Sequence, residues 1–197
     1  KRTRRQPEAV DTEIMEVPPQ ILEYYKDVRL SFDVMHVNQI PFLVSISRNI
    51  HYGTAHVLSS MKIPVMENIM KKVVGSYRSR GFNVVMINVD IQFKPIEDRN
   101  TIPGVKINVC GRGEHIPEIE RFLRLIKERA RCYFAMLPYR WVPAIMIVHL
   151  IKTVLYYINA FVWRRGVSQI LSPLTIMHGT KLDFNVNFPV VYGTFAH

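Results

Sequence analysis

The sequence predicts an α/β fold with a mixed sheet, and three observations support this expectation. Residues 28–35 alternate apolar and polar side chains, residues 42–47 are mostly apolar, and the short turn between them requires the two strands to be antiparallel. An amphipathic helix then separates them from a Val- and Ile-rich strand at 82–89, and a strand–helix–strand order favours a parallel crossover. With 197 residues, 48% of them apolar, the chain is long enough for one domain with a buried core.

The chain before the first strand, residues 1–27, is expected to be an arm or linker because it mixes basic residues, prolines and acids. One helical turn is expected within it, near residues 21–26. Residues 37–41 are predicted to form the turn between the first two strands. A weaker third strand is predicted around residues 52–58.

The first long helix is predicted to begin at Pro64, because apolar residues then recur with the spacing of one helix face. This stripe consists of Met66, Ile69, Met70, Val73, Val74 and Tyr77. Gly81 lies where a helix C-cap is expected. After the strand at 82–89, residues 105–109 alternate in a further short strand.

A second helix is predicted with Pro117 at its first position, running to about residue 135. Its apolar stripe consists of Ile119, Phe122, Leu123, Ile126 and Ala130. A third helix is predicted over 141–161. Glycines and prolines recur in residues 166–197, so turns and short strands are expected there. The expected organisation is a core over 28–165 with a C-terminal extension at 166–197.

Residues 141–163 are the nearest approach to a membrane span in the sequence. Lys152 lies near the middle of this segment, where a lysine costs ~2.5–3.5 kcal/mol on insertion scales. A buried core helix is therefore expected, and no membrane partner. Trp141 and Trp163 are expected in the core rather than as platforms for nucleobases, and His51 as a surface or packing residue.

The composition favours a polyanionic partner. Lys and Arg number 26 against 16 Asp and Glu, a formal net charge of +10, which points to nucleic acid before a membrane surface. Only two cysteines are present, Cys110 and Cys132, which excludes a disulfide scaffold and a four-cysteine zinc site.

Three carboxylates form the candidate catalytic site. Asp33 lies within the first strand, Asp90 ends the strand at 82–89, and Glu120 lies in the first turn of a helix. If the two strands are neighbours, both aspartates can meet at one sheet edge and the helix can close the site. Three such groups raise one another's pKa, and a divalent cation relieves that repulsion. Carboxylate oxygens suit Mg²⁺ or Mn²⁺, and two such ions can activate a water or a 3′-hydroxyl.

Each carboxylate also has a structural explanation. An aspartate at a strand end is commonly a turn former or N-cap, and a glutamate near a helix N-terminus stabilises the helix dipole. Glu118 is a second candidate for the third position of the site. The spacing leaves these alternatives open.

The second helix carries charged residues along one face: Glu120, Arg124, Lys127 and Arg131 fall at i, i+4, i+7 and i+11. Such a stripe can hold phosphates beside an acidic metal site. The alternative is a solvated face with Glu120–Arg124 and Arg124–Glu128 pairs, each worth a few tenths of a kcal/mol. Both interpretations remain open from the sequence.

The chain resembles the catalytic core of retroelement integrases, most closely the copia-type retrotransposon group, over residues 28–197. The resemblance is carried by the order of five stretches rather than by any single motif. These are residues 30–35, 82–93, 115–130, 156–159 and 172–193.

The resemblance implies an RNase H-like fold, with a mixed five-stranded sheet flanked by helices. It also implies an enzyme: a Mg²⁺-dependent polynucleotidyl transferase that processes the DNA ends of an element and joins them to host DNA. Asp33, Asp90 and Glu120 would then hold two Mg²⁺ or Mn²⁺ ions, with no organic cofactor. Integrases grip DNA at positions matching Arg124 and Lys127.

Arg131 and His115 are further candidate DNA contacts, and residues 111–116 match the active-site loop of integrases. The resemblance further implies double-stranded DNA as partner, a homo-oligomer, a nuclear location and an origin as part of a retroelement polyprotein. The alternative is a decayed, non-enzymatic DNA-binding or interaction module on the same fold. That alternative is motivated by Ile91 and Gln92, which follow Asp90 where integrases have a polar run.

Overall fold

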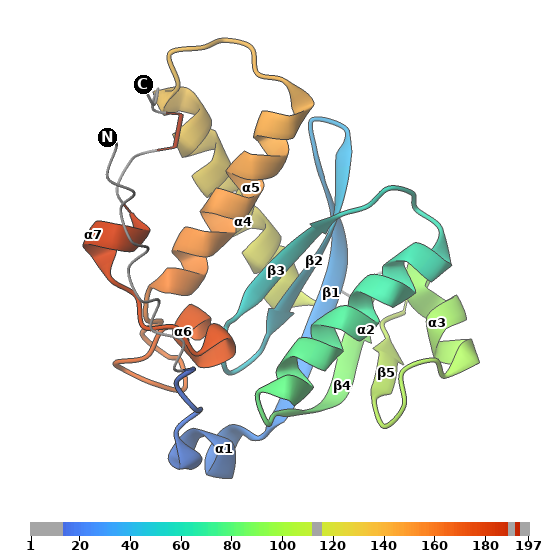
Figure 1. Ribbon diagram of the computed structural model, residues 1–197. Helices are drawn as coiled ribbons and strands as arrows, with labels where there is room; N and C mark the ends of the chain where they lie inside the picture. The colour runs from blue at the N-terminus through green and yellow to red at the C-terminus, as the bar shows by residue number, and fades with distance from the viewer. Residues whose placement is uncertain (1–13, 112–115, 189–191, 194–197) are drawn as a thin grey trace, which may run out of the picture.

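The computed structural model describes residues 14–111, 116–188 and 192–193. Its centre is a five-stranded sheet in the order β3-β2-β1-β4-β5 (Figure 1). The strands are β1 (Asp27–Val37), β2 (Ile40–Ser47), β3 (Gly53–Val57), β4 (Asn83–Val89) and β5 (Lys106–Val109). All five lie where the sequence predicts strands.

The sheet is mixed, as predicted. β1 pairs antiparallel with β2, and β2 with β3, whereas β1–β4 and β4–β5 are parallel. The turn after β1 contains Asn38 and Gln39, which both have positive φ, 46° and 66°. Two left-handed residues in succession match the right-handed twist of a tight hairpin, so β2 returns directly alongside β1. This puts β1 at the centre of the sheet, between its antiparallel and parallel halves.

Helix α2 (Ile63–Ser79) covers one face of the sheet and links β3 to β4. The predicted apolar stripe is confirmed, because Met66, Met70 and Tyr77 are buried in the core on this face. The helix ends at Arg80, and Gly81 follows with a φ of 85°. Glycine adopts this left-handed conformation at no steric cost, so the chain can turn sharply into β4.

Helices α4 (Pro117–Met136) and α5 (Ala144–Ala160) cover the opposite face (Figure 1). Together with inward residues of β1 and β2 they form a second hydrophobic cluster. Four of the five predicted stripe residues of α4 are buried: Ile119, Phe122, Ile126 and Ala130. Five strands with helices on both faces confirm the predicted α/β class. No helix in the described part of the chain is both long and apolar enough to span a membrane.

In the part of residues 166–197 that the structure describes, the predicted turns are present and the predicted short strands are not. This part contains α6 (Pro173–His178) and α7 (Phe184–Asn187). Ser172 caps α6, because its Oγ accepts a hydrogen bond from the Thr175 N–H at 3.1 Å. The element η1 (Ile91–Phe93) and α3 (Lys94–Arg99) were also not predicted. These elements are too short to show a periodic pattern.

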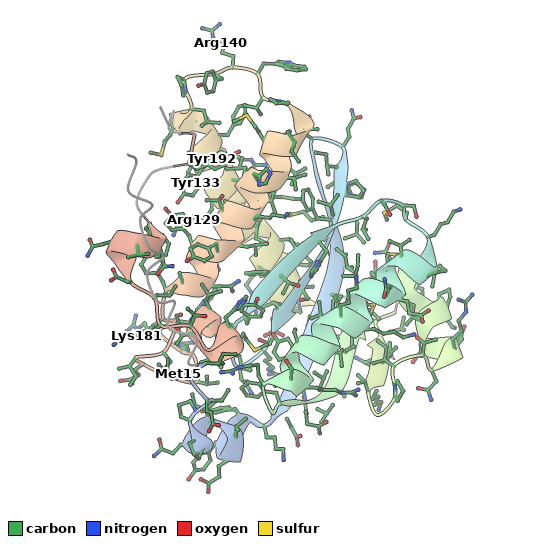
Figure 2. All side chains as sticks on the ribbon, in the orientation of Figure 1. Met15, Arg129, Tyr133, Arg140, Lys181 and Tyr192 are labelled. Atoms are coloured by element: carbon green, nitrogen blue, oxygen red, sulfur yellow. The ribbon has the colours of Figure 1, made fainter. Side chains whose placement is uncertain are left out.

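The described part of the N-terminal arm packs on the core. It contains α1 (Pro19–Tyr25), where one helical turn was predicted, and Val17 and Ile21 are buried. The Met15 N–H donates to the Gly179 carbonyl at 2.8 Å. Met15 is labelled in Figure 2. The Arg80 guanidinium donates to the carbonyls of Met15 and Ile176, at 2.7 and 3.0 Å. One side chain at the end of α2 therefore binds both the arm and α6.

Candidate active site

The two aspartates lie on adjacent parallel strands. Asp33 belongs to β1, and Asp90 directly follows the last residue of β4. Ser31 of β1 pairs with Asn88 of β4, so Asp33 and Asp90 each come two residues after a paired position. Side chains two residues apart in a strand share a face, which puts both aspartates on the side covered by α4. The sequence-based expectation that their strands are neighbours is confirmed.

Asp33 lies among several charged groups that shift the pKa of its carboxyl. It is half-buried, and its Oδ1 accepts a hydrogen bond from the Val34 N–H at 2.7 Å. Burial raises the pKa of the Asp33 carboxyl, and the Val34 hydrogen bond lowers it. The negative charges of Asp90 and Glu120 raise this pKa further, whereas the positive charge of Lys127 lowers it. The net shift is upward. The charges of the other two candidate carboxylates and of Lys127 therefore all act on Asp33.

Asp90 is exposed and has a structural role as well. Its Oδ1 accepts a hydrogen bond from the Ile91 N–H at 2.7 Å, which caps η1. The N-cap interpretation of this aspartate is thus realised in the structure. A cap uses one carboxylate oxygen, and a carboxylate has two that can accept or coordinate. Capping and metal binding are therefore compatible at this position.

Glu118 and Glu120 separate clearly in the structure. Glu120 is exposed, and its charge acts on Asp33. Glu118 is half-buried, and its Oε2 accepts a long hydrogen bond from Ser31 Oγ at 3.5 Å. Burial raises the pKa of Glu118, while Arg48, Ser31 and Arg121 lower it, and the net shift is upward. Glu118 therefore faces a different group of side chains, and Glu120 is the carboxylate that joins the two aspartates.

The basic stripe of α4 borders the carboxylates. Arg124 and Arg131 are exposed, and Lys127 is half-buried. Both interpretations of this face stay predictions: a stripe that holds phosphates, and a solvated face with Glu120–Arg124 and Arg124–Glu128 pairs. His115, the fourth predicted DNA contact, lies outside the described residues, as does most of the predicted active-site loop.

A metal ion would need carboxylates from several elements. Among the described residues, no three His, Cys, Asp or Glu side chains lie close enough together to hold a single ion. In two-ion sites, however, the cations lie roughly 3.5–4 Å apart, so the ligands are spread over a wider region. The donor set of Asp33, Asp90 and Glu120 is all oxygen, which suits Mg²⁺ or Mn²⁺. Burial is the main cause of the raised pKa of Asp33, and the negative charges of Asp90 and Glu120 add to it; a cation would offset those charges.

A pocket of about 570 Å³ adjoins this site, and sequence reasoning missed it. It lies against Asn88 and the start of α4, and Arg48, Glu118, Arg121 and Trp163 contribute to its walls. These residues are scattered along the chain and form no motif. They come from β4, from the start of α4 and from the residues that follow β2 and α5, and only the packing of these elements brings them together.

Comparison with protein-family models gives no match to this chain, and comparison with curated proteins gives none either. Function must therefore be argued from the fold, from the residues of the site and from the resemblance described above.

Proposed function

We propose that this chain is the RNase H-like catalytic core of a polynucleotidyl transferase, similar to copia-type retrotransposon integrases. It would process the DNA ends of an element and join them to target DNA. One observation carries the proposal: the carboxyl of Asp33 on the central strand is electrostatically coupled to Asp90, Glu120 and Lys127. The three acids and the lysine come from three places in the fold: β1, the residue after β4, and α4.

The sheet supports the same proposal. A mixed five-stranded sheet flanked by helices is what the resemblance to integrases implies, and the chain has this architecture. The two aspartates come from β1 and from the end of β4, and the glutamate comes from the helix that covers them. In open sheets with parallel strands, binding sites form beyond the carboxyl ends of the strands, where Asp90 lies.

The residues divide the chemistry between them. Asp33, Asp90 and Glu120 would hold two Mg²⁺ or Mn²⁺ ions, which when bound activate a water or 3′-hydroxyl and stabilise the leaving oxygen of a phosphodiester. The N–H groups of Val34 and Ile91 each fix one oxygen of an aspartate, which orients both carboxylates. Arg124, Lys127 and Arg131 offer positive charge along α4 for the phosphates of DNA.

The partners follow from this activity. Double-stranded DNA, from both element and target, would lie along the basic stripe of α4, and the net charge of +10 favours its approach. By resemblance, the protein would act in the nucleus as a homo-oligomer.

The test is a strand-transfer assay with short DNA ends and Mg²⁺ or Mn²⁺, comparing wild type with Asp90→Asn. Asparagine can still accept the Ile91 hydrogen bond but carries no charge, so the cap is kept. We expect a loss greater than the roughly 10–100-fold typical of residues that only orient a ligand. Asp98→Asn, an exposed aspartate of α3, is the matched control and should retain full activity. Equal activity of wild type and Asp90→Asn would reject the assigned site.

A second candidate function is a non-catalytic DNA-binding module on the same fold. It is favoured by the use of Asp90 as a cap and by Ile91, a large apolar residue that is 47% exposed beside it. This candidate expects DNA binding that weakens steeply with salt, with no metal-dependent cutting or joining in any variant. The strand-transfer assay therefore separates the two candidates.

A further inference from the structure

The pocket beside the carboxylates has one aromatic wall. The rings of His51 and Trp163 are stacked, with centroids 4.8 Å apart and an interplanar angle of 19°. Burial lowers the pKa of His51, so its ring is neutral at pH 7 and acts as a flat aromatic surface. The indole of Trp163 is half-buried and lines the pocket. A flat aromatic wall of this kind is suited to another flat ring.

The remaining walls are mixed, because charged and polar side chains stand among apolar ones. The apolar residues are Ile46, Ile116, Pro117, Phe122 and Leu125. The Glu118 carboxylate lies in the pocket, and the charges of Arg48 and Arg121 both act on it. The Asn88 Oδ1 accepts a hydrogen bond from Asn108 Nδ2 at 3.0 Å, which leaves the Asn88 amide N–H groups as donors. Two arginines and one glutamate give the pocket a net charge of +1. It therefore offers acceptors for an amino group and positive charge for a phosphate.

The pocket lies two residues along β1 and β4 from the candidate active site. Ser31, which hydrogen-bonds Glu118, is two residues from Asp33 on the same face of β1. Asn88 is likewise two residues from Asp90. If a nucleic acid strand binds at the carboxylates, its neighbouring nucleotide would lie near the pocket. The volume of about 570 Å³ lies within the range of roughly 300–1,000 Å³ typical of small-ligand sites.

We propose that this pocket binds one unpaired nucleobase of a nucleic acid strand. The base stacks on the wall formed by Trp163 and His51, and an amino group of the base donates a hydrogen bond to Glu118. Arg48 and Arg121 bind a phosphate of the same strand. The choice of nucleic acid as ligand rests on the proposed function. Guanine fits best, because its ring N–H and amino group lie on one edge and can both donate to a carboxylate. Thymine has no amino group and presents a methyl and carbonyl oxygens instead.

Other ligand classes fit less well. An apolar small molecule would remove water from Glu118 and two arginines and offer them no hydrogen bonds of its own, which is costly. Inorganic phosphate alone would use the arginines but leave the aromatic wall unused and approach Glu118, a like charge. A nucleotide uses both halves of the pocket. Bases drawn out of a duplex are commonly held in this way, by stacking and by hydrogen bonds to the pairing edge.

The chain offers a direct optical test, because it has only two tryptophans. Trp141 is 87% exposed and lies between α4 and α5, so Trp141→Phe leaves Trp163 as the sole reporter. Metal-free protein is titrated with dGMP, dTMP and inorganic phosphate while Trp163 fluorescence is followed, with free tryptophan correcting for absorption by the nucleotides. We expect saturable quenching by dGMP, binding of dTMP about tenfold weaker, and no quenching by phosphate.

Variants in the same background locate the effect. Glu118→Gln keeps an acceptor for Ser31 but presents a weaker one to the base, so the preference for dGMP should fall about tenfold. Glu128→Gln, an exposed glutamate further along α4, is the matched control and should bind as the parent. Arg121→Gln should weaken both nucleotides alike. Absence of quenching by dGMP, equal binding of dGMP and dTMP, or an unchanged Glu118→Gln would overturn the inference.

The titration is independent of catalysis. If the protein joins DNA ends but dGMP gives no quenching, the nucleobase pocket is wrong and the proposed function stands. If dGMP binds as expected and no joining or metal-dependent cutting is found, the pocket stands and the proposed activity fails.

Discussion

Asn159→Ala should destabilise the fold by about 4 kcal/mol, because one buried amide joins α5 to β3. Asn159 is 4% exposed, its Nδ2 donates to the Gly53 carbonyl at 2.7 Å, and its Oδ1 accepts from the Gly53 N–H at 2.9 Å. Alanine leaves both backbone groups buried without these partners, and each such group costs about 1–3 kcal/mol, which sums to roughly 2–6 kcal/mol. For a chain of this size, 4 kcal/mol lowers the melting temperature by roughly 8–16 °C.

The measurement is thermal and urea unfolding followed by circular dichroism. The matched control is Asn108→Ala, which removes an exposed amide that donates a hydrogen bond to Asn88. Exposed substitutions of this kind usually change stability by less than about 0.5 kcal/mol. The free energies of unfolding of Asn159→Ala and Asn108→Ala could instead differ by less than about 1 kcal/mol, which is the size of ordinary surface effects. The two hydrogen bonds to Gly53 would then not stabilise the contact between α5 and β3.

Three further predictions concern charge. Burial and neighbouring acids raise the pKa of Asp33, so the folded protein binds more protons than the unfolded chain, and stability falls as pH rises through that raised pKa. In metal-free buffer at pH 7, Asp33→Asn should therefore melt at a higher temperature than wild type, and Mg²⁺ should raise the melting temperature of wild type only. Burial lowers the pKa of His51, so as pH falls below about 6.5 the unfolded chain binds a proton more readily than the folded protein, and stability drops. His51→Phe should therefore lose less stability than wild type between about pH 7 and 5.5. In DNA-binding titrations, Arg124→Gln should reduce the salt slope by roughly 0.9, whereas Arg99→Gln on α3 should not.

Each of these has a contrary outcome. A melting temperature of Asp33→Asn below that of wild type at pH 7, or equal stabilisation of both by Mg²⁺, would contradict the electrostatics assigned to the site. Parallel pH–stability curves for wild type and His51→Phe would show that His51 titrates normally. Identical salt slopes for Arg124→Gln and Arg99→Gln would remove the α4 stripe from the DNA interface.

Long periodic elements were predictable from the sequence, whereas the short helices α3, α6 and α7 were not. α2 and α4 have 17 and 20 residues, so their apolar stripes repeat over several turns. α6 has six residues and depends on the Ser172 cap and on Pro173, signals that are also common in turns. The prediction that Trp141 lies in the core is wrong, because α5 begins only at Ala144 and leaves this tryptophan on the exposed connection.

The candidate site shows the same division. Asp33 and Asp90 could be paired in advance because adjacent parallel strands bring their ends to one edge. The choice between Glu118 and Glu120 could not be made, because it depends on how α4 is rotated against β1. The stacking of His51 on Trp163 was also inaccessible, since it joins the residues after β2 to those after α5. The rotation of a helix against a sheet and the contact between residues far apart in the sequence both depend on packing. Neither leaves a periodic pattern in the sequence.

The contacts of Arg80 bear on how the chain reaches its final state during synthesis. The guanidinium at the end of α2 binds carbonyls of Met15 and Ile176, which are separated by most of the polypeptide. Met15 is synthesised well before Ile176, so the arm cannot acquire its full set of contacts until α6 has been made. Until then the buried side chains of Val17 and Ile21 lack part of their cover. The nascent chain therefore exposes an apolar segment that chaperones can recognise until α6 emerges.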